Sequence, residues 1–230
     1  MPDFQGNYGK GDILEITKEH VALLLLVDTS GSMYGSKIKQ VNDGINNMIR
    51  ELANDENAQN VVEISVVEFN SDVNVVSDFK AACQCQPVTL NATGGTNMGE
   101  GILTAIDNLK ARVRTYGTKG TPVRKPWIFM LTDGYPNSIC RLDEAKTKLN
   151  EEMQKRDGKG DFLFWCIGTP DADFDLLKEL ATPGCCGKID DSSLYTLFDW
   201  IAKSMITISS AKATDTQATV SQPPFMQIPI

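Results

Sequence analysis

The alternation of apolar runs with amphipathic segments predicts an α/β protein. Residues 21–27 read Val-Ala-Leu-Leu-Leu-Leu-Val, and a run without any polar position is typical of a central parallel strand covered on both faces. After this run, apolar residues recur at steps of three and four, the period of a helix that packs through one face. The residues of this stripe are Ile38, Val41, Ile45, Met48 and Leu52. The chain therefore begins with a buried strand and a helix, the repeating unit of a parallel sheet.

The same pattern continues along the chain. Further strands are predicted at residues 61–69, 73–79, 127–131 and 162–167, with a weak one at 188–190. Further apolar stripes predict helices around Ile102–Val113, Leu142–Met153, Leu176–Leu180 and Leu194–Ile208. Only residues 70–72 separate the second and third strands, so the third strand should run antiparallel at an edge. We predict a doubly wound, mostly parallel central sheet with one antiparallel edge strand and helices on both faces.

The length of 230 residues corresponds to one large domain with appendages. We expect an N-terminal extension at residues 1–17, the domain at 18–210 and a disordered tail at 211–230, where the sequence becomes small and polar. The longest apolar run is seven residues, whereas a bilayer span needs about 20. The first residues also lack the basic and then apolar regions of a secretory signal. These features predict a cytoplasmic protein without a membrane partner.

Charge and histidine content narrow the chemistry. The chain has 22 basic and 30 acidic residues and a net charge of −8, which argues against a nucleic-acid partner. Its single histidine, His20, excludes three-histidine zinc sites and two-histidine iron sites. His20 stands at the start of the first predicted strand, where we expect a structural role.

The cysteines leave one alternative open. Cys83, Cys85, Cys185 and Cys186 could bind zinc through four thiolates, but neither pair has the two-residue spacer of a zinc knuckle. Cys166 lies in an apolar run and is expected to be a buried thiol.

Three loops combine glycine with oxygen-bearing side chains. Two of them directly follow predicted strands, at residues 28–32 and 132–134, and the third, at residues 94–99, precedes a helix. The candidate ligands are two carboxylates and three hydroxyls, namely Asp28, Ser30, Ser32, Thr96 and Asp133. Such a set suits Mg²⁺ or Mn²⁺ and disfavours zinc. For residues 28–32 alone, a helix-capping turn is the structural alternative.

Other polar and aromatic residues near these loops have simpler interpretations. Asp43 and Asp107 are expected to be solvated helix positions, and Asp190 and Asp191 are expected to cap the last helix. Tyr34 and Tyr135 flank the candidate ligands in sequence. They either form an exposed rim suited to a protein interface or pack on neighbouring loops.

The pattern Asp28-x-Ser30-x-Ser32, completed by Thr96 and Asp133, resembles the metal-ion-dependent adhesion site (MIDAS) of the von Willebrand factor A (vWA) domain. The resemblance covers residues 18–210. It implies a Rossmann-like vWA fold in which the first strand and the strand at Trp127 are neighbours, with Asp28 and Asp133 facing each other across a crevice.

The resemblance also implies roles for the candidate ligands. Ser30 and Ser32 would bind Mg²⁺ (or Mn²⁺ or Ca²⁺) directly, and Thr96 would bind it directly in the ligand-bound state. Asp28 and Asp133 would often act through waters. One position of the cation would remain for a carboxylate from an Asp or Glu of a protein partner.

The leading hypothesis is a metal-dependent protein-binding module without enzymatic activity and without catalytic residues. Residues 94–96 and 126–134 are most similar to the bacterial TerY-type branch, which is linked to tellurium-resistance operons. This similarity implies a stress-resistance or phage-defence system whose kinase or phosphatase components would be partners. One alternative is a Mg²⁺-dependent phosphate hydrolase, but the sequence offers no Gly-rich phosphate loop with Lys and no evident general base. Another is a structural scaffold whose metal only steadies loops.

Overall fold

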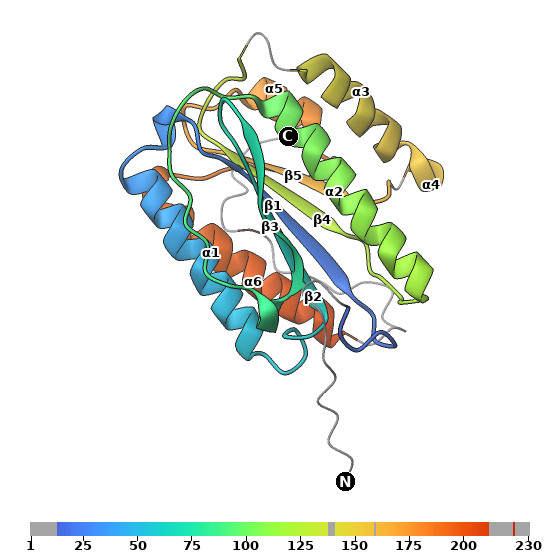
Figure 1. Ribbon diagram of the computed structural model, residues 1–230. Helices are drawn as coiled ribbons and strands as arrows, with labels where there is room; N and C mark the ends of the chain where they lie inside the picture. Colours follow the sequence, from blue (N-terminus) through green and yellow to red (C-terminus); the bar gives the residue numbers. More distant parts are fainter. Residues whose placement is uncertain (1–12, 138–140, 159, 212–222, 224–230) are drawn as a thin grey trace.

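The computed structural model describes residues 13–137, 141–158, 160–211 and 223, which form one sheet with helices on both faces (Figure 1). The six strands are β1 (Val21–Asp28), β2 (Val62–Phe69), β3 (Val73–Ala81), β4 (Trp127–Thr132), β5 (Leu163–Gly168) and β6 (Cys186–Lys188). The helices are α1 (Ser36–Asn54), α2 (Met98–Lys119), α3 (Leu142–Met153), α4 (Lys155–Gly158), α5 (Phe174–Leu180) and α6 (Leu194–Ser210). Three short 3₁₀ turns are η1 (Gly31–Met33), η2 (Ala82–Gln84) and η3 (Asp191–Ser193).

The strand order is β3-β2-β1-β4-β5-β6, and every pair is parallel except β2 with β3. This order confirms the predicted doubly wound, mostly parallel sheet with one antiparallel edge strand. The weak strand expected at 188–190 begins two residues earlier, at Cys186. Helix α4 was not predicted, because four residues are too few to show a helical period.

Two apolar layers explain the unbroken run of β1. Leu23 and Leu25 pack into a cluster with residues of α1 and α6. Leu24 and Leu26 belong to a second cluster, with residues of α2, α3 and α5. Because successive side chains of a strand point to opposite faces, β1 needs apolar residues at every position.

An aromatic cluster fixes α6 against the sheet. Phe129 of β4 stacks on Trp165 of β5 with ring centroids 5.2 Å apart, and Trp200 of α6 meets Trp165 edge-on at 5.4 Å. Such pairs add stabilisation beyond the burial of their area. The middle of α6 is therefore anchored to β4 and β5.

Of the predicted extension at residues 1–17, the structure describes residues 13–17, and Ile13 among them is buried in the core. The predicted tail at 211–230 lies outside the described residues except for Ala211 and Pro223. Within the described ranges, no helix has the length and apolar character needed to cross a bilayer.

Candidate functional site

The candidate site lies where the chain leaves the centre of the sheet in opposite directions. β1 pairs with β2 on one side and with β4 on the other, so β1 and β4 enclose the switch point of the doubly wound sheet. Loops that follow the strands at such a point diverge and leave a crevice at their carboxyl ends. Asp28 is the last residue of β1, and Asp133 directly follows the last residue of β4.

Hydrogen bonds join four of the five candidate residues in one row. The backbone N–H of Ser30 donates to Asp28 Oδ1 at 2.8 Å. The hydroxyls of Ser30 and Ser32 lie 3.1 Å apart, and the Ser32 hydroxyl donates to Asp133 Oδ1 at 2.7 Å. Two carboxylates and two hydroxyls from loops 101 positions apart in sequence therefore meet at one edge of the sheet.

Asp28 is buried, with no exposed surface, and has no cationic partner among its hydrogen bonds. Its Oδ2 accepts the Thr132 hydroxyl at 2.6 Å. Burial raises the pKa of Asp28 from 3.8 to about 6; bonds from Ser30 and Thr132 oppose the rise, and the charge of Asp133 adds to it. The carboxylate would therefore gain from a nearby cation.

The loop of Thr96 is tied to both other loops through its backbone. Gly31 N–H donates to Gly94 carbonyl oxygen at 3.0 Å, and Asn137 N–H donates to Thr96 carbonyl oxygen at 2.9 Å. Gly94 has φ +73°, a conformation that favours glycine. Thr96 itself is 7% exposed. The structure thus places the third predicted loop beside the other two, through backbone bonds rather than a hydroxyl contact.

The start of α2 is fixed by a close approach to α3. A Cβ at Gly99 would lie 2.5 Å from the carbonyl carbon of Arg141 and from the nitrogen of Leu142, a distance that backbone atoms cannot accommodate. Glycine at this position therefore allows α2 and α3 to begin side by side, next to the Thr96 loop.

Lys37, which was not among the predicted site residues, contacts the site. Its Nζ lies 2.7 Å from Asp133 Oδ2 and 3.6 Å from Asp191 Oδ2, and its side chain is 14% exposed. Burial lowers the pKa of Lys37, but the hydrogen bond and charges of Asp133 and Asp191 outweigh burial and raise it. The one sequence signal is a lysine in the first turn of a helix, where the helix dipole disfavours positive charge.

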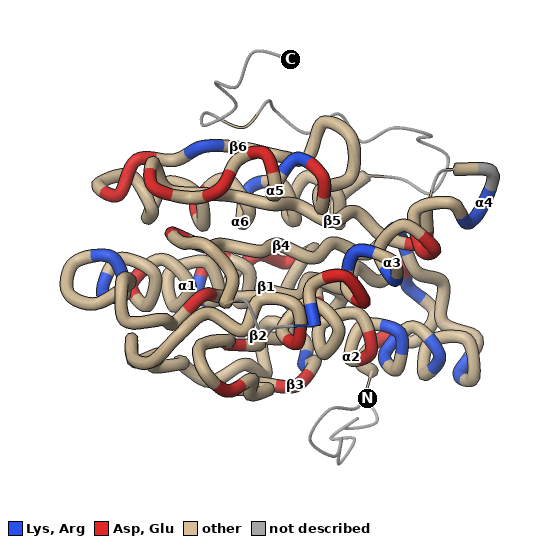
Figure 2. The backbone as a smooth tube through the Cα atoms, turned by 90° about the horizontal axis from the view of Figure 1, so that it is seen from above, with Lys and Arg blue, Asp and Glu red and all other residues tan. Residues whose placement is uncertain are grey.

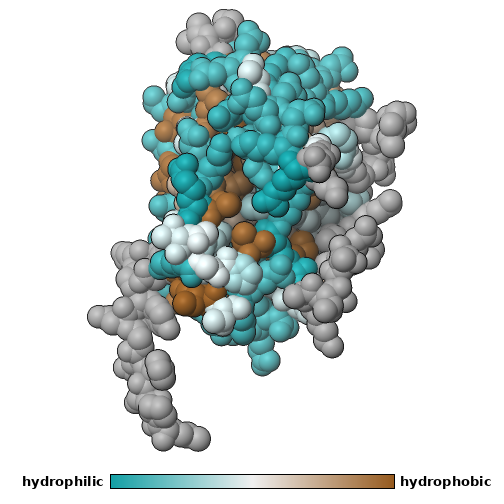
Figure 3. All heavy atoms as spheres, turned by 90° about the vertical axis from the view of Figure 1, so that its right-hand side faces the viewer, coloured by the Kyte–Doolittle hydropathy of each residue, from teal (hydrophilic) through white to brown (hydrophobic). Residues whose placement is uncertain are grey.

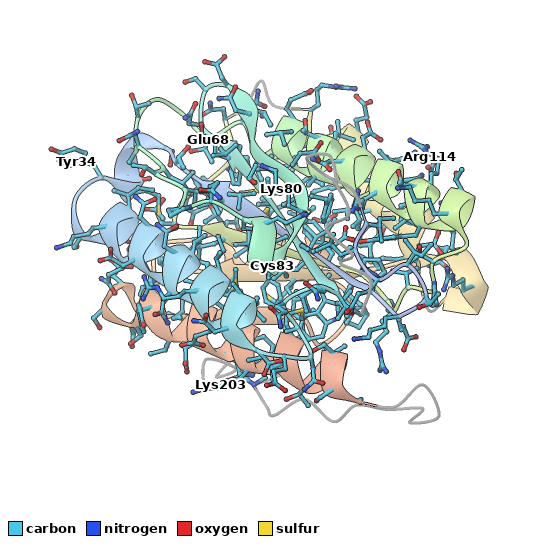
Figure 4. All side chains as sticks on the ribbon, turned by 60° about the horizontal axis from the view of Figure 1, so that its bottom comes forward. Tyr34, Glu68, Lys80, Cys83, Arg114 and Lys203 are labelled. Atoms are coloured by element: carbon cyan, nitrogen blue, oxygen red, sulfur yellow. The ribbon has the colours of Figure 1, made fainter. Side chains whose placement is uncertain are left out.

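Exposed aromatic residues flank the row. Tyr34 is 80% exposed and Tyr135 is 65% exposed, and Figure 4 shows Tyr34 directed away from the body of the protein, beyond the start of α1. Both side chains are therefore exposed and do not pack on neighbouring loops, the second of their two interpretations.

Two aspartates of the last loop differ from their predicted role. Helix α6 has Ser193 at its N-cap position and no capping side-chain hydrogen bond, so the prediction that Asp190 and Asp191 cap it is wrong. Asp191 instead pairs with Lys37, because η3 places it beside the first turn of α1. Asp43 and Asp107 are exposed helix residues, as expected.

The cysteines do not form the alternative zinc site. Cys83 and Cys85 lie next to β3, and Cys185 and Cys186 lie at β6. Strands β3 and β6 are the two edges of the sheet, so the two cysteine pairs are far apart. Cys166 is a buried thiol, as expected.

A second charged cluster lies at the opposite end of the sheet. Glu63 of β2 is buried with His20, whose Nδ1 lies 3.1 Å from Glu63 Oε1. Glu63 Oε2 accepts the Tyr116 hydroxyl at 2.7 Å and a hydrogen bond from Arg112 Nε. His20 is therefore part of a buried network, which agrees with its predicted structural role.

The oxygen donors of the candidate site fit a hard divalent cation. No three His, Cys, Asp or Glu side chains gather into a ligand cluster among the described residues. A cation at the row would meet two carboxylates, Asp28 and Asp133, and would take further ligands from hydroxyls, a set suited to Mg²⁺, Mn²⁺ or Ca²⁺. Asp28, a buried carboxylate without a cationic partner, would supply negative charge to such a cation.

Comparisons with known proteins identify relatives over about two thirds of the chain. The mouse inter-alpha-trypsin inhibitor heavy chain H2 is 29% identical over 167 residues, which are 69% of this chain and 16% of that protein. The human heavy chain H6 is 26% identical over 172 residues, 69% of this chain and 12% of that protein. The chain therefore matches a small part of these relatives.

Solved structures share the fold at low identity. The vWF domain of the pilus tip protein Mfa5 from Porphyromonas gingivalis has a TM-score of 0.61 and 15% identity, over 86% of this chain and 99% of that one. Proximal thread matrix protein 1 from the mussel byssus, solved with a zinc-occupied MIDAS motif, has a TM-score of 0.60 and 18% identity, over 81% of this chain and 48% of that one.

The family model of the von Willebrand factor type A domain matches residues 22–200. This match runs from β1 into α6 and includes all five candidate residues. The chain belongs to the von Willebrand factor type A domain family.

Proposed function

We propose that Asp28, Ser30, Ser32, Thr96 and Asp133 form a MIDAS-type site for a divalent cation, Mg²⁺ or alternatively Mn²⁺ or Ca²⁺. The bound cation would supply an acceptor for a carboxylate from an Asp or Glu of a protein partner. The protein would then be a metal-dependent protein-binding module.

One observation carries the proposal: the hydrogen-bonded row that joins Asp28, Ser30, Ser32 and Asp133 at the switch point of the sheet. Three of the five candidate ligands are neutral hydroxyls, so a bound cation keeps part of its charge for an outside ligand. The zinc-occupied MIDAS motif of the mussel protein supports a divalent cation at this place in the fold.

The surroundings of the row favour a protein as the outside ligand. Tyr34 and Tyr135 are exposed and belong to the two loops that carry the row, and aromatic residues are enriched in protein interfaces. A partner would place its carboxylate in the row and its apolar side chains against the two tyrosines.

The finer identity of the partner rests on the sequence resemblance alone. Residues 94–96 and 126–134 are similar to TerY-type proteins, and we propose kinase or phosphatase components of the same operon as partners, in a cytoplasmic stress-resistance or phage-defence system. Co-purification of the protein with the products of neighbouring genes, in Mg²⁺ and in EDTA, tests this part separately.

Isothermal titration with MgCl₂ tests the site. Wild type should bind one equivalent of Mg²⁺, and Asp28→Ala should lose measurable binding because the row loses a carboxylate. Asp43→Ala, which removes an exposed aspartate of α1, is the matched control and should bind as wild type does. Equal binding by wild type and Asp28→Ala would contradict the proposal.

Peptide selection tests the carboxylate. Peptides selected on the protein in Mg²⁺ should be released by EDTA, and replacing their Asp and Glu by Asn and Gln should abolish binding. Binding that is weakened neither by EDTA nor by these replacements would favour a scaffold whose metal only steadies loops. Turnover of a generic phosphoester that disappears in Asp133→Ala would favour the hydrolase alternative.

A further inference from the structure

A cavity of about 260 Å³ lies at the end of the molecule opposite the MIDAS-type row. The second half of α2 forms one wall, and the segments that lead into β4 and β5 form the others. Pro126 and Phe162, which line the cavity, directly precede these two strands. The cavity therefore opens at the amino ends of the strands whose carboxyl ends border the row.

The inner surface of the cavity is apolar. Leu109 and Val113 of α2 line it together with Val123 and Phe162, and Leu109 and Phe162 are core residues. Figure 3 looks onto the side of the molecule that carries α4 and the end of α2, and apolar atoms are visible there between hydrophilic ones. An apolar surface in a concave setting is what binds the hydrocarbon part of a small ligand.

The rim of the cavity is basic although the chain is acidic. Five basic side chains line the cavity and one acidic side chain accompanies them, whereas the whole chain has a net charge of −8. The basic residues are Lys110, Arg114, Arg124, Lys125 and Arg156. Figure 2 shows Lys and Arg gathered along the end of α2 and on α4.

Ion pairs neutralise some of these charges. Lys110 pairs with Glu152 at 2.7 Å, Arg124 with Glu19 at 2.8 Å and Arg156 with Asp161 at 2.7 Å.

Arg114 has no ion-pair partner within the part of the chain that the structure describes, and Figure 4 shows it on α2. Positive charge is therefore available at the mouth of an apolar cavity.

We propose that this cavity binds a small amphiphilic anion, a medium-chain carboxylate whose hydrocarbon body fills the apolar interior and whose head lies at Arg114. The volume equals that of roughly nine water molecules in the liquid, which suits an eight-carbon chain. The guanidinium of Arg114 matches a carboxylate geometrically, because its N–H groups can bind both oxygens.

Octanoate is the probe that tests the proposal, with NMR of the full chain as the measurement. Octanoate should bind with a dissociation constant on the order of 0.1–1 mM and perturb amides of residues 109–126 and 160–163. Octanol, which lacks the charge, should bind at least about five-fold more weakly. Equal binding of octanoate and octanol would overturn the anion assignment.

Three variants locate the ligand. Arg114→Gln should weaken octanoate binding about five-fold, whereas Arg50→Gln, the same change on α1 across the sheet, should leave it unchanged. Val113→Phe should abolish binding by filling the cavity, while its circular dichroism and melting temperature report on folding. Asp28→Ala, which removes the row at the other end, should bind octanoate as wild type does. Unchanged binding in both Arg114→Gln and Val113→Phe would overturn the proposal.

Vesicles distinguish a soluble carboxylate from a lipid headgroup. Phosphatidylserine vesicles should not sediment the protein under conditions where octanoate binds. Sedimentation with vesicles in the absence of octanoate binding would show a membrane surface as the partner and would contradict the cavity proposal.

Discussion

Two buried carboxylate clusters occupy opposite ends of the same sheet, and they differ in how their charge is neutralised. Glu63 has Arg112, His20 and Tyr116 as direct partners. Burial raises the pKa of Glu63, but these partners outweigh burial and lower it overall. Asp28 is as buried, yet burial prevails and its pKa rises to about 6.

The difference lies in the charge of the partners. Asp28 accepts hydrogen bonds from Ser30 and Thr132, which are neutral donors, and Asp133 adds a second negative charge nearby. A carboxylate with its own cation serves as a structural tie within the fold. A carboxylate held only by neutral donors leaves an attraction for a cation from outside, which is why the functional proposal rests on Asp28 and not on Glu63.

The largest effect is expected at Glu63. Glu63→Gln removes the charge that Arg112 faces in the interior, and breaking a buried pair in this way costs about 3–5 kcal/mol. Urea denaturation measures the change in the free energy of unfolding. Glu68→Gln, on the same strand but partly exposed, should change it by less than about 0.5 kcal/mol. If Glu63→Gln and Glu68→Gln changed the free energy of unfolding equally, Glu63 would not act as a structural tie, and its contrast with Asp28 would be lost.

The second effect is a pH dependence set by Asp28. Its folded-state pKa of about 6 lies above the ordinary 3.8, so between these pH values the folded protein binds more protons than the unfolded chain. In EDTA, the contribution of Asp28 to the free energy of unfolding should therefore fall by about 3 kcal/mol as the pH rises from about 4 to about 6, and level off above that range.

Asp28→Asn should remove this part of the pH dependence, and saturating Mg²⁺ should reduce it, because a bound cation favours the ionised carboxylate. Mg²⁺ affinity should fall as the pH drops below about 6, since protons compete for Asp28. If the free energy of unfolding depended on pH in the same way in wild type and Asp28→Asn, the charge of Asp28 would have to be neutralised by a contact that the structure does not contain.

The smallest of the three effects is expected at Lys37. Its ammonium bonds to Asp133 at 2.7 Å, so a divalent cation must displace it or bind beside it. Lys37→Gln should tighten Mg²⁺ binding about ten-fold by titration calorimetry, which corresponds to about 1.4 kcal/mol. Lys39→Gln changes the same charge on an exposed part of α1 and should have little effect. Unchanged binding in Lys37→Gln would show that the ammonium does not compete with the cation, and weaker binding would show that Lys37 supports the cation site.

Asp191 gives a further test of the same interaction. It is the second carboxylate near the Lys37 ammonium, at 3.6 Å, and offers a place for the ammonium when a cation occupies the row. Asp191→Asn should weaken Mg²⁺ binding in wild type and have a smaller effect in the Lys37→Gln background, a coupling that a double-mutant cycle measures.

The pattern of apolar residues was sufficient to predict the strands and most helices. β1 is predicted by an apolar run because both of its faces are covered, and β3 by a turn too short for a crossover. The same pattern missed α4, which is shorter than one helical repeat needs. It also misassigned Asp190 and Asp191, because capping propensity describes the local chain, whereas Asp191 bonds to a lysine of another helix.

The fold class and the placement of the five oxygen-bearing residues at the ends of strands and helices could be predicted from local patterns along the chain. Which charges meet could not, because it depends on the packing of distant elements. Lys37 reaches Asp133 across 96 positions, and Arg112 reaches Glu63 across 49. Periodicity indicates which face of an element is buried, but the partner of a buried charge depends on how distant elements pack. That partner distinguishes a structural carboxylate from one that is open to a cation.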